Sequence, residues 1–155
     1  MAISDLLRGC PLFFELYDPE IEKIVKYCTV YTFAAGEHIV SDGQVGNEIF
    51  IILDGSVIIQ KKTPQRTVKI QTLRRGDVFG EMVLVDEKTR SADIISETVS
   101  HILEIKYNDI FSLFKKEPQV FGLMILNLSR LLAKRLRGSN QIIVELREEN
   151  ERKAA

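Results

Sequence analysis

The residues Gly76–Ala92, GDVFGEMVLVDEKTRSA, carry more chemical information than any other segment of the chain. The segment opens with a Phe-Gly-Glu turn at residues 79–81 and continues with a short apolar run, 82–84, that can form one helical turn. A polar loop follows and closes on Arg90-Ser91-Ala92. Strand-like runs lie on both sides, so we predict an irregular binding loop held on a rigid sheet.

The residue types in this segment suit a small anion that carries a ribose. Gly80 allows close approach of a ligand and backbone conformations that other residues resist. The N–H groups of residues 81–84 would be unpaired at the start of a helical turn, and such groups attract anions. Arg90 can add a forked, charge-assisted hydrogen bond to a phosphate, whereas ionised Glu81 only accepts hydrogen bonds and suits a sugar hydroxyl. The alternative is that Glu81 and Arg90 form a surface ion pair worth about 0–1 kcal/mol.

The segment closely resembles the phosphate-binding cassette of cyclic nucleotide-binding domains. In that family Phe-Gly-Glu is followed by Leu or Met, a small residue and Leu, and after several loop residues by Arg, then Ala, Ser or Thr, then Ala. The resemblance implies that Glu81 binds the ribose 2'-hydroxyl, that Arg90 binds the cyclic phosphate, and that Ser91 lies beside the phosphate or the base. Backbone N–H groups near Met82 and Val83 would complete the cradle for the phosphate. The implied cassette site therefore comprises Phe79, Gly80, Glu81, Met82, Val83, Arg90, Ser91 and Ala92.

Val83 departs from the family pattern, because the family has a small residue at this place. A β-branched side chain here could crowd the phosphate or shift the loop.

Short apolar runs alternate with turns from residue 29 to residue 106. Val, Ile, Phe and Thr dominate the runs, and Gly or Pro bounds them. Asp54-Gly55 between two apolar runs is typical of a two-residue hairpin. This many short strands predict an α+β protein built on an antiparallel β-roll, also called a jelly roll or double-stranded β-helix. The turn glycines further resemble those at the corners of this family's β-roll: Gly36, Gly43, Gly46, Gly55 and Gly76.

Helical patterns flank the predicted roll. Residues 1–28 predict short N-terminal helices at 3–9 and 18–28, and residues 107–155 predict C-terminal helices. The longest helix covers about 119–152, with apolar positions at spacings of three and four, which is typical of a coiled-coil seam. Its far half extends beyond a domain of this size, so we predict a parallel homodimer. The whole chain, 1–155, is predicted to be one cyclic nucleotide-binding domain with its cassette at 76–92.

The long helix also resembles the C-helix of the catabolite activator family. There, a Thr-Ser pair reaches the base of the nucleotide, one residue from each subunit. The resemblance implies this role for Ser139 and for Asn140 of the partner subunit; alternatively, both are polar positions in the seam. Gly138 is a possible weak point of the helix. The basic run Arg130, Lys134, Arg135 and Arg137 is interpreted as a solvated helix face.

The composition of the chain excludes several classes of function. The chain has 155 residues and a net charge of -1, so no overall field draws it to nucleic acid or to anionic membranes. No apolar run approaches the ~20 residues of a membrane span, and nothing reads as a signal peptide. Cys10, Cys28, His38 and His101 lack metal-ligand or disulfide spacing, so we expect a cytoplasmic protein without a metal or other cofactor. No catalytic motif is present, and an enzyme is not expected.

The sequence thus predicts a cyclic nucleotide sensor, with cyclic AMP as the expected ligand and cyclic GMP left open. Two alternatives remain. One is a dimeric scaffold whose pocket no longer binds, with Val83 as the clue. The other is a regulatory fragment of a longer transcription factor, channel or enzyme. The chain itself carries no segment resembling the activators' DNA-binding domain. The downstream protein partner, the pathway and the active state are not specified by the sequence.

Overall fold

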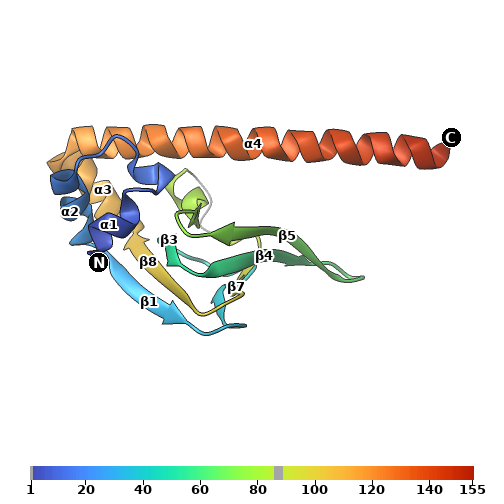
Figure 1. Ribbon diagram of the computed structural model, residues 1–155, viewed down its shortest axis with the longest axis horizontal. Helices are drawn as coiled ribbons and strands as arrows, with labels where there is room; N and C mark the ends of the chain where they lie inside the picture. Colours follow the sequence, from blue (N-terminus) through green and yellow to red (C-terminus); the bar gives the residue numbers. More distant parts are fainter. Residues whose placement is uncertain (1, 86–88) are drawn as a thin grey trace.

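A computed structural model describes residues 2–85 and 89–155 as a β-roll with helices gathered on one side and one helix running far past it (Figure 1). The helices are α1 (Ile3–Leu7), α2 (Asp18–Val25), α3 (Tyr107–Lys116) and α4 (Pro118–Ala154), with short 3-10 helices η1 (Pro11–Phe13) and η2 (Glu81–Leu84). The strands are β1 (Thr29–Phe33), β2 (His38–Val40), β3 (Glu48–Asp54), β4 (Ser56–Lys62), β5 (Thr67–Arg74), β6 (Val78–Phe79), β7 (Asp93–Ser96) and β8 (Ser100–Lys106).

Two four-stranded antiparallel sheets form the roll. One has the strand order β1-β8-β3-β6, and the other has the order β2-β7-β4-β5. Together with the flanking helices, these sheets confirm the predicted α+β fold class. The two sheets enclose an apolar interior in which the rings of Phe50 and Phe79 stack with their centroids 4.9 Å apart.

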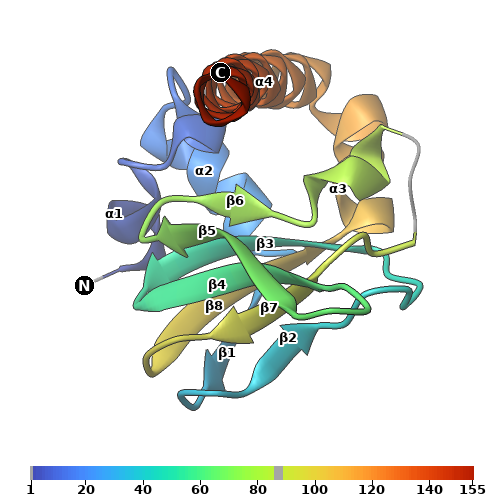
Figure 2. The same cartoon turned by 90° about the vertical axis from the view of Figure 1, so that its right-hand side faces the viewer.

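The central strand β3 is buried on both faces, because successive side chains of a strand point to opposite sides. Phe50 and Ile52 face the interior of the roll. Ile49, Ile51 and Leu53 face a larger apolar cluster that includes residues of the N-terminal helices, α3 and α4. The helices are therefore fixed to the sheet that carries β6, the strand that leads into the cassette (Figure 2).

The Asp54-Gly55 turn is not a hairpin, so that prediction is wrong. β3 and β4 lie in different sheets, and the turn carries the chain around a corner of the roll. Gly55 has φ 89°, and a Cβ there would lie 2.4 Å from Oγ of Ser100. Local sequence signals a tight turn in either case, whereas the choice of sheet depends on packing. The extended hairpin is instead formed by β4 and β5 around residues 63–66 (Figure 1).

The α4 helix has two halves with different surroundings. Val120, Met124 and Leu128 are buried in its first half, and the amide of Asn127 donates to the carbonyl oxygens of Leu12 and Phe14. From residue 136 onward every residue is exposed. At ~1.5 Å per residue the helix is about 55 Å long, and its second half extends past the roll (Figure 1).

Candidate functional site

Within the cassette, a single turn of 3-10 helix follows a glycine whose backbone lies in the left-handed region. Gly80 has φ 76°, and a Cβ there would lie 2.8 Å from the Glu48 carbonyl oxygen and 2.8 Å from Nη1 of Arg90. Glycine is therefore required by both conformation and space. The η2 turn begins directly after it. The N–H of Val83, expected from the sequence to be unpaired, donates to the Gly80 carbonyl oxygen at 3.4 Å, so the N–H groups of Glu81 and Met82 are the ones at the start of the turn that can receive an anion.

Arg90 lies against the roll with only 9% of its side chain exposed. Nη2 donates to the carbonyl oxygen of Glu48 at 2.9 Å and to its carboxylate at 3.1 Å, and Nη1 donates to the Gly80 carbonyl oxygen at 3.4 Å. The guanidinium also lies over the ring of Phe50, 5.7 Å from its centroid. Arg90 is thus held beside the η2 turn by β3, an arrangement that keeps its charge next to the anion cradle.

Gly46 makes room for this arginine. A Cβ on Gly46 would lie 2.3 Å from Nε and Nη2 of Arg90. Its backbone does not have positive φ, unlike Gly36, Gly43, Gly55 and Gly76. The sequence suggested a turn glycine here, and the structure adds a steric reason that no local signal could reveal.

Glu81 is held from the other side, by helix α4. Its side chain pairs with Nη1 of Arg135, whose Nη2 donates to the carbonyl oxygen of Val78. Glu81 is only 8% exposed, so this partner prevents an isolated buried charge. The interpretation of Arg135 as part of a solvated helix face is therefore wrong. Lys134 and Arg137, one and two residues away, are exposed, and only the packing of α4 shows which of these cations faces the cassette.

The other predicted cassette residues have distinct surroundings. Phe79 is buried and supports the site from the core of the roll. Met82 is 48% exposed. Val83 is buried in the apolar cluster beneath the helices, so its side chain packs into the core. This position removes the clue that favoured a crowded pocket. The carbonyl oxygen of Ser91 accepts from Nζ of Lys61 at 2.7 Å, and Ala92 is half-buried.

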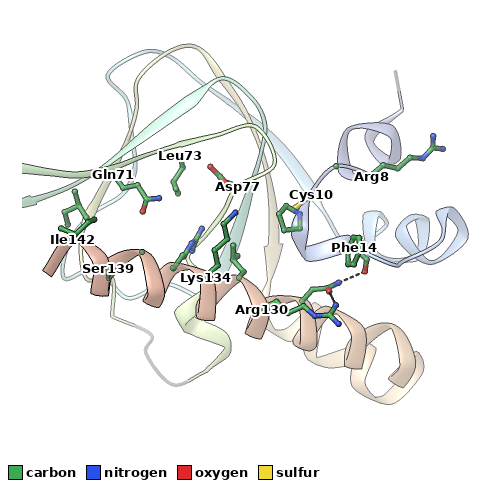
Figure 3. A pocket seen from close by; sticks show the side chains of 17 residues that line it. Arg8, Cys10, Phe14, Gln71, Leu73, Asp77, Arg130, Lys134, Ser139 and Ile142 are labelled. Atoms are coloured by element: carbon green, nitrogen blue, oxygen red, sulfur yellow. Dashed lines mark hydrogen bonds between the residues drawn. The ribbon is translucent and has the colours of Figure 1, made fainter. Parts of the chain in front are cut away.

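A cleft of about 740 Å³ lies between α4 and the roll, next to the cassette. Ser139 lines this cleft near its far end, together with Gln71 and Ile142 (Figure 3). Asn140 is exposed, and the cleft lining does not include it. Within one chain the structure therefore brings Ser139, but not Asn140, to the space beside the cassette.

A second pocket, of about 360 Å³, is lined by Arg90 and by residues of β1, β2, β3 and β8. Glu48 and Glu104 both line it. Burial raises the pKa of Glu104, and the nearby charge of Glu48 raises it further. Arg90 therefore lies near two acidic side chains, Glu48 and Glu104, and also contacts the residue that precedes η2.

The two cysteine thiols are held in their protonated form by burial. Burial raises the pKa of Cys10 to about 11 and that of Cys28 to about 12. Among residues 2–85 and 89–155, no three His, Cys, Asp or Glu side chains gather to hold a metal ion. No helix in this part of the chain is both long and apolar enough to cross a membrane.

Comparisons with known proteins agree with this geometry. The family described as "Cyclic nucleotide-binding domain" matches residues 30–117. The chain is 30% identical over 134 residues to the cyclic AMP receptor protein of Thermus thermophilus, a match covering 84% of this chain and 59% of that protein. It is 37% identical over 95 residues to cGMP-dependent protein kinase, isozyme 1, of Drosophila melanogaster, which covers 59% of this chain and 12% of the kinase. A crystal structure of a cyclic nucleotide-binding domain from Methylobacillus flagellatus superimposes with a TM-score of 0.82 at 22% identity, over 92% of this chain and 80% of that one, and supports the fold.

The chain belongs to the cyclic nucleotide-binding domain family. Its fold is that of a regulatory, ligand-binding domain, and the family predicted from the sequence is confirmed. The chain spans 12% and 59% of the two relatives described above, so their whole-protein activities are not transferred to it.

Proposed function

We propose that this chain is a regulatory sensor that binds cyclic AMP at the cassette and responds through α4. The observation that carries the proposal is the geometry around Gly80. A left-handed glycine, the free start of η2 and the nearly buried guanidinium of Arg90 converge on one small volume, which suits a singly charged cyclic phosphate. Glu81 stands at the same turn as the acceptor for the ribose hydroxyl.

The choice of cyclic AMP rests on the helix as well as on the cassette. The match to the Thermus cyclic AMP receptor protein covers 84% of the chain, whereas the match to the cGMP-dependent kinase covers 59%. Ser139 and Gln71 supply neutral polar groups across the cleft, where a purine edge would lie if the ribose meets Glu81. Ser91 does not discriminate, because a hydroxyl serves either purine.

Signalling would pass through the ion pair between Glu81 and Arg135. The same carboxylate that accepts from the ribose is bound to α4, so occupancy of the site changes the contact that positions the helix. The ligand can shift α4 only by the difference between its affinities for the two helix positions. A protein partner would then read the changed helix surface.

The proposed sensor is a parallel homodimer joined through the second half of α4. Leu136, Ile143 and Leu146 are exposed by 62%, 50% and 54% in the half of α4 that extends past the roll. Their spacings of seven and three fit a coiled-coil seam, and covering them with a second copy would stabilise that half.

The dimer is tested by changing seam residues that make no buried contact within the chain. Leu136→Glu combined with Ile143→Glu should give a monomer in sedimentation velocity, because two carboxylates in each seam repel and leave the apolar stripe broken. The matched control is Leu126→Glu, a 46% exposed leucine on another face of the same helix. A dimer that survives the double substitution contradicts the seam.

Ligand binding is tested by calorimetric titration of the purified, nucleotide-free protein with cyclic AMP and cyclic GMP. We expect a saturable curve at micromolar or lower concentration, with cyclic AMP tighter than cyclic GMP. Tighter binding of cyclic GMP would overturn the proposed ligand but keep the site. Absence of binding to the folded protein by either nucleotide would overturn the proposed function.

A further inference from the structure

The cleft beneath α4 extends well away from the cassette. Its far end, described above, carries Gln71 and Ser139, but its other end is formed by the segment Gly9–Phe14 and the α4 residues Asn127, Arg130, Leu131 and Lys134. The whole cleft measures about 740 Å³, within the usual range for small-molecule sites. The end near η1 is not needed for a nucleotide held by Glu81 and Arg90.

This end of the cleft would stay open in the proposed dimer. At about 100° per residue, Lys134 lies about 160–180° around the helix from Leu136 and Ile143. A partner helix seated on the seam therefore covers the opposite face of α4 and leaves the η1 end of the cleft accessible.

The charges here favour an anion. Among the described residues, Nζ of Lys134 makes no hydrogen bond or ion pair, and it extends from α4 toward Asp77 and the segment that carries Cys10 (Figure 3). Within residues 2–85 and 89–155, the Arg130 side chain donates only to Oδ1 of Asn127, at 3.0 Å. Arg8 is paired with Asp5 and Asp18, and its side chain points away from the cleft (Figure 3).

Among the described residues that line the cleft, one carboxylate opposes these two cations. Asp77 also lines the cleft, and its Oδ2 accepts from the backbone N–H of Arg74 at 2.8 Å. The η1 end therefore has a net positive charge beside apolar walls, which include Pro11, Phe14 and Leu131.

We propose that the η1 end of this cleft binds a second effector, a small amphipathic anion. Its carboxylate, sulfonate or phosphate head would meet Lys134 and Arg130, and its apolar body would lie along Pro11, Phe14 and Leu131. This site is separate from the cassette and does not depend on nucleotide binding. Because it contacts the same helix as Arg135, its occupant would change nucleotide affinity through the position of α4.

The test uses the full chain and three probes of equal chain length: decanoate, decyl phosphate and neutral decanol. We expect calorimetry to show saturable binding of the two anions below about 1 mM and much weaker binding of decanol. Lys134→Glu should weaken the anions by about tenfold or more, because a charged hydrogen bond is replaced by repulsion. The matched control is Arg137→Glu, an exposed residue of the same helix with the same change in charge, which should alter affinity less than about twofold.

Amide chemical shifts locate the probe and separate this proposal from the cassette. Decanoate should shift the amides of residues 9–14, and Arg90→Ala should remove nucleotide binding while leaving decanoate binding intact. The proposal is overturned if no anion saturates, if decanol binds equally well, or if Lys134→Glu and Arg137→Glu behave alike. It is also overturned if decanoate shifts the cassette instead and is lost with Arg90→Ala.

Discussion

The two charged residues of the cassette are held by different parts of the molecule. Arg90 takes all its described contacts from the roll, through Glu48, Phe50 and the carbonyl oxygen of Gly80. Glu81 takes its partner from α4, through Arg135. In the proposed function, the phosphate end of the site is therefore preorganised by a rigid sheet, whereas the ribose end is joined to the helix that would move.

This difference assigns different tasks to the two ends. A group fixed by the roll contributes affinity without needing a conformational change, since its position is already paid for by folding. In the proposed sensor, a group shared with α4 contributes coupling, because its contacts would differ between two positions of the helix. Substitutions at Arg90, Arg135, Glu81 and Glu48 should separate these tasks, with effects that decrease in that order.

Removing Arg90, the residue proposed to bind the phosphate, should have the largest effect on nucleotide affinity. Arg90→Ala is expected to weaken every cyclic nucleotide by about 100-fold or more, because the ligand's charge loses a nearly buried, forked donor. Calorimetry measures the loss, and circular dichroism checks the fold. Arg66→Ala in the β4–β5 turn, an exposed arginine, is the control and should bind normally. An unchanged affinity in Arg90→Ala would remove the phosphate assignment.

Breaking the contact with α4 should next affect stability. Arg135→Ala leaves the buried Glu81 carboxylate without its partner, and we expect a loss of about 1–3 kcal/mol in the free energy of unfolding. Urea denaturation at fixed protein concentration gives this value. Arg137→Ala, exposed on the same helix, should change it by less than about 0.5 kcal/mol. Equal effects of the two substitutions would mean that the Glu81–Arg135 contact is not stabilising.

The ribose role predicts a selective loss. Glu81→Gln keeps the shape but lowers acceptor strength, so cyclic AMP should bind about tenfold more weakly. The 2'-deoxy analogue, which lacks the hydroxyl, should lose less than about threefold. Equal losses for both nucleotides would contradict a contact with the 2'-hydroxyl.

The smallest effect concerns the residue that holds Arg90. In Glu48→Gln the carbonyl oxygen still positions the guanidinium, but the competing negative charge is gone. Nucleotide affinity should rise by about two- to fivefold. Glu22→Gln, an exposed acid on α2, is the control for net charge. A clear decrease would mean that the Glu48 carboxylate is needed to orient Arg90.

The sequence predicted what depends on local pattern. Alternating runs and turn glycines were enough for the roll, and the helix expected at about 119–152 is found at Pro118–Ala154. The helical turn expected after Gly80 is η2. These features are encoded by neighbours in the chain, so a single sequence carries them.

The sequence could not predict contacts between distant segments. Arg90 and Glu48 are 42 residues apart, and Arg135 and Glu81 are 54 apart. Nothing near Arg135 distinguishes it from Lys134 or Arg137, because the rotation of α4 against the roll is set by packing at Val120, Met124 and Leu128. The same reason explains Val83, whose side chain packs in the core.

Hydrogen exchange with and without cyclic AMP is the most direct test of the link between cassette and helix. We predict slower exchange in two segments of the wild-type protein, residues 80–85 and residues 131–139 of α4. In Arg135→Ala, at nucleotide concentrations that saturate the site, only the first segment should respond. Protection confined to the cassette in the wild-type protein would contradict the account, because the bound nucleotide would then leave α4 unaffected.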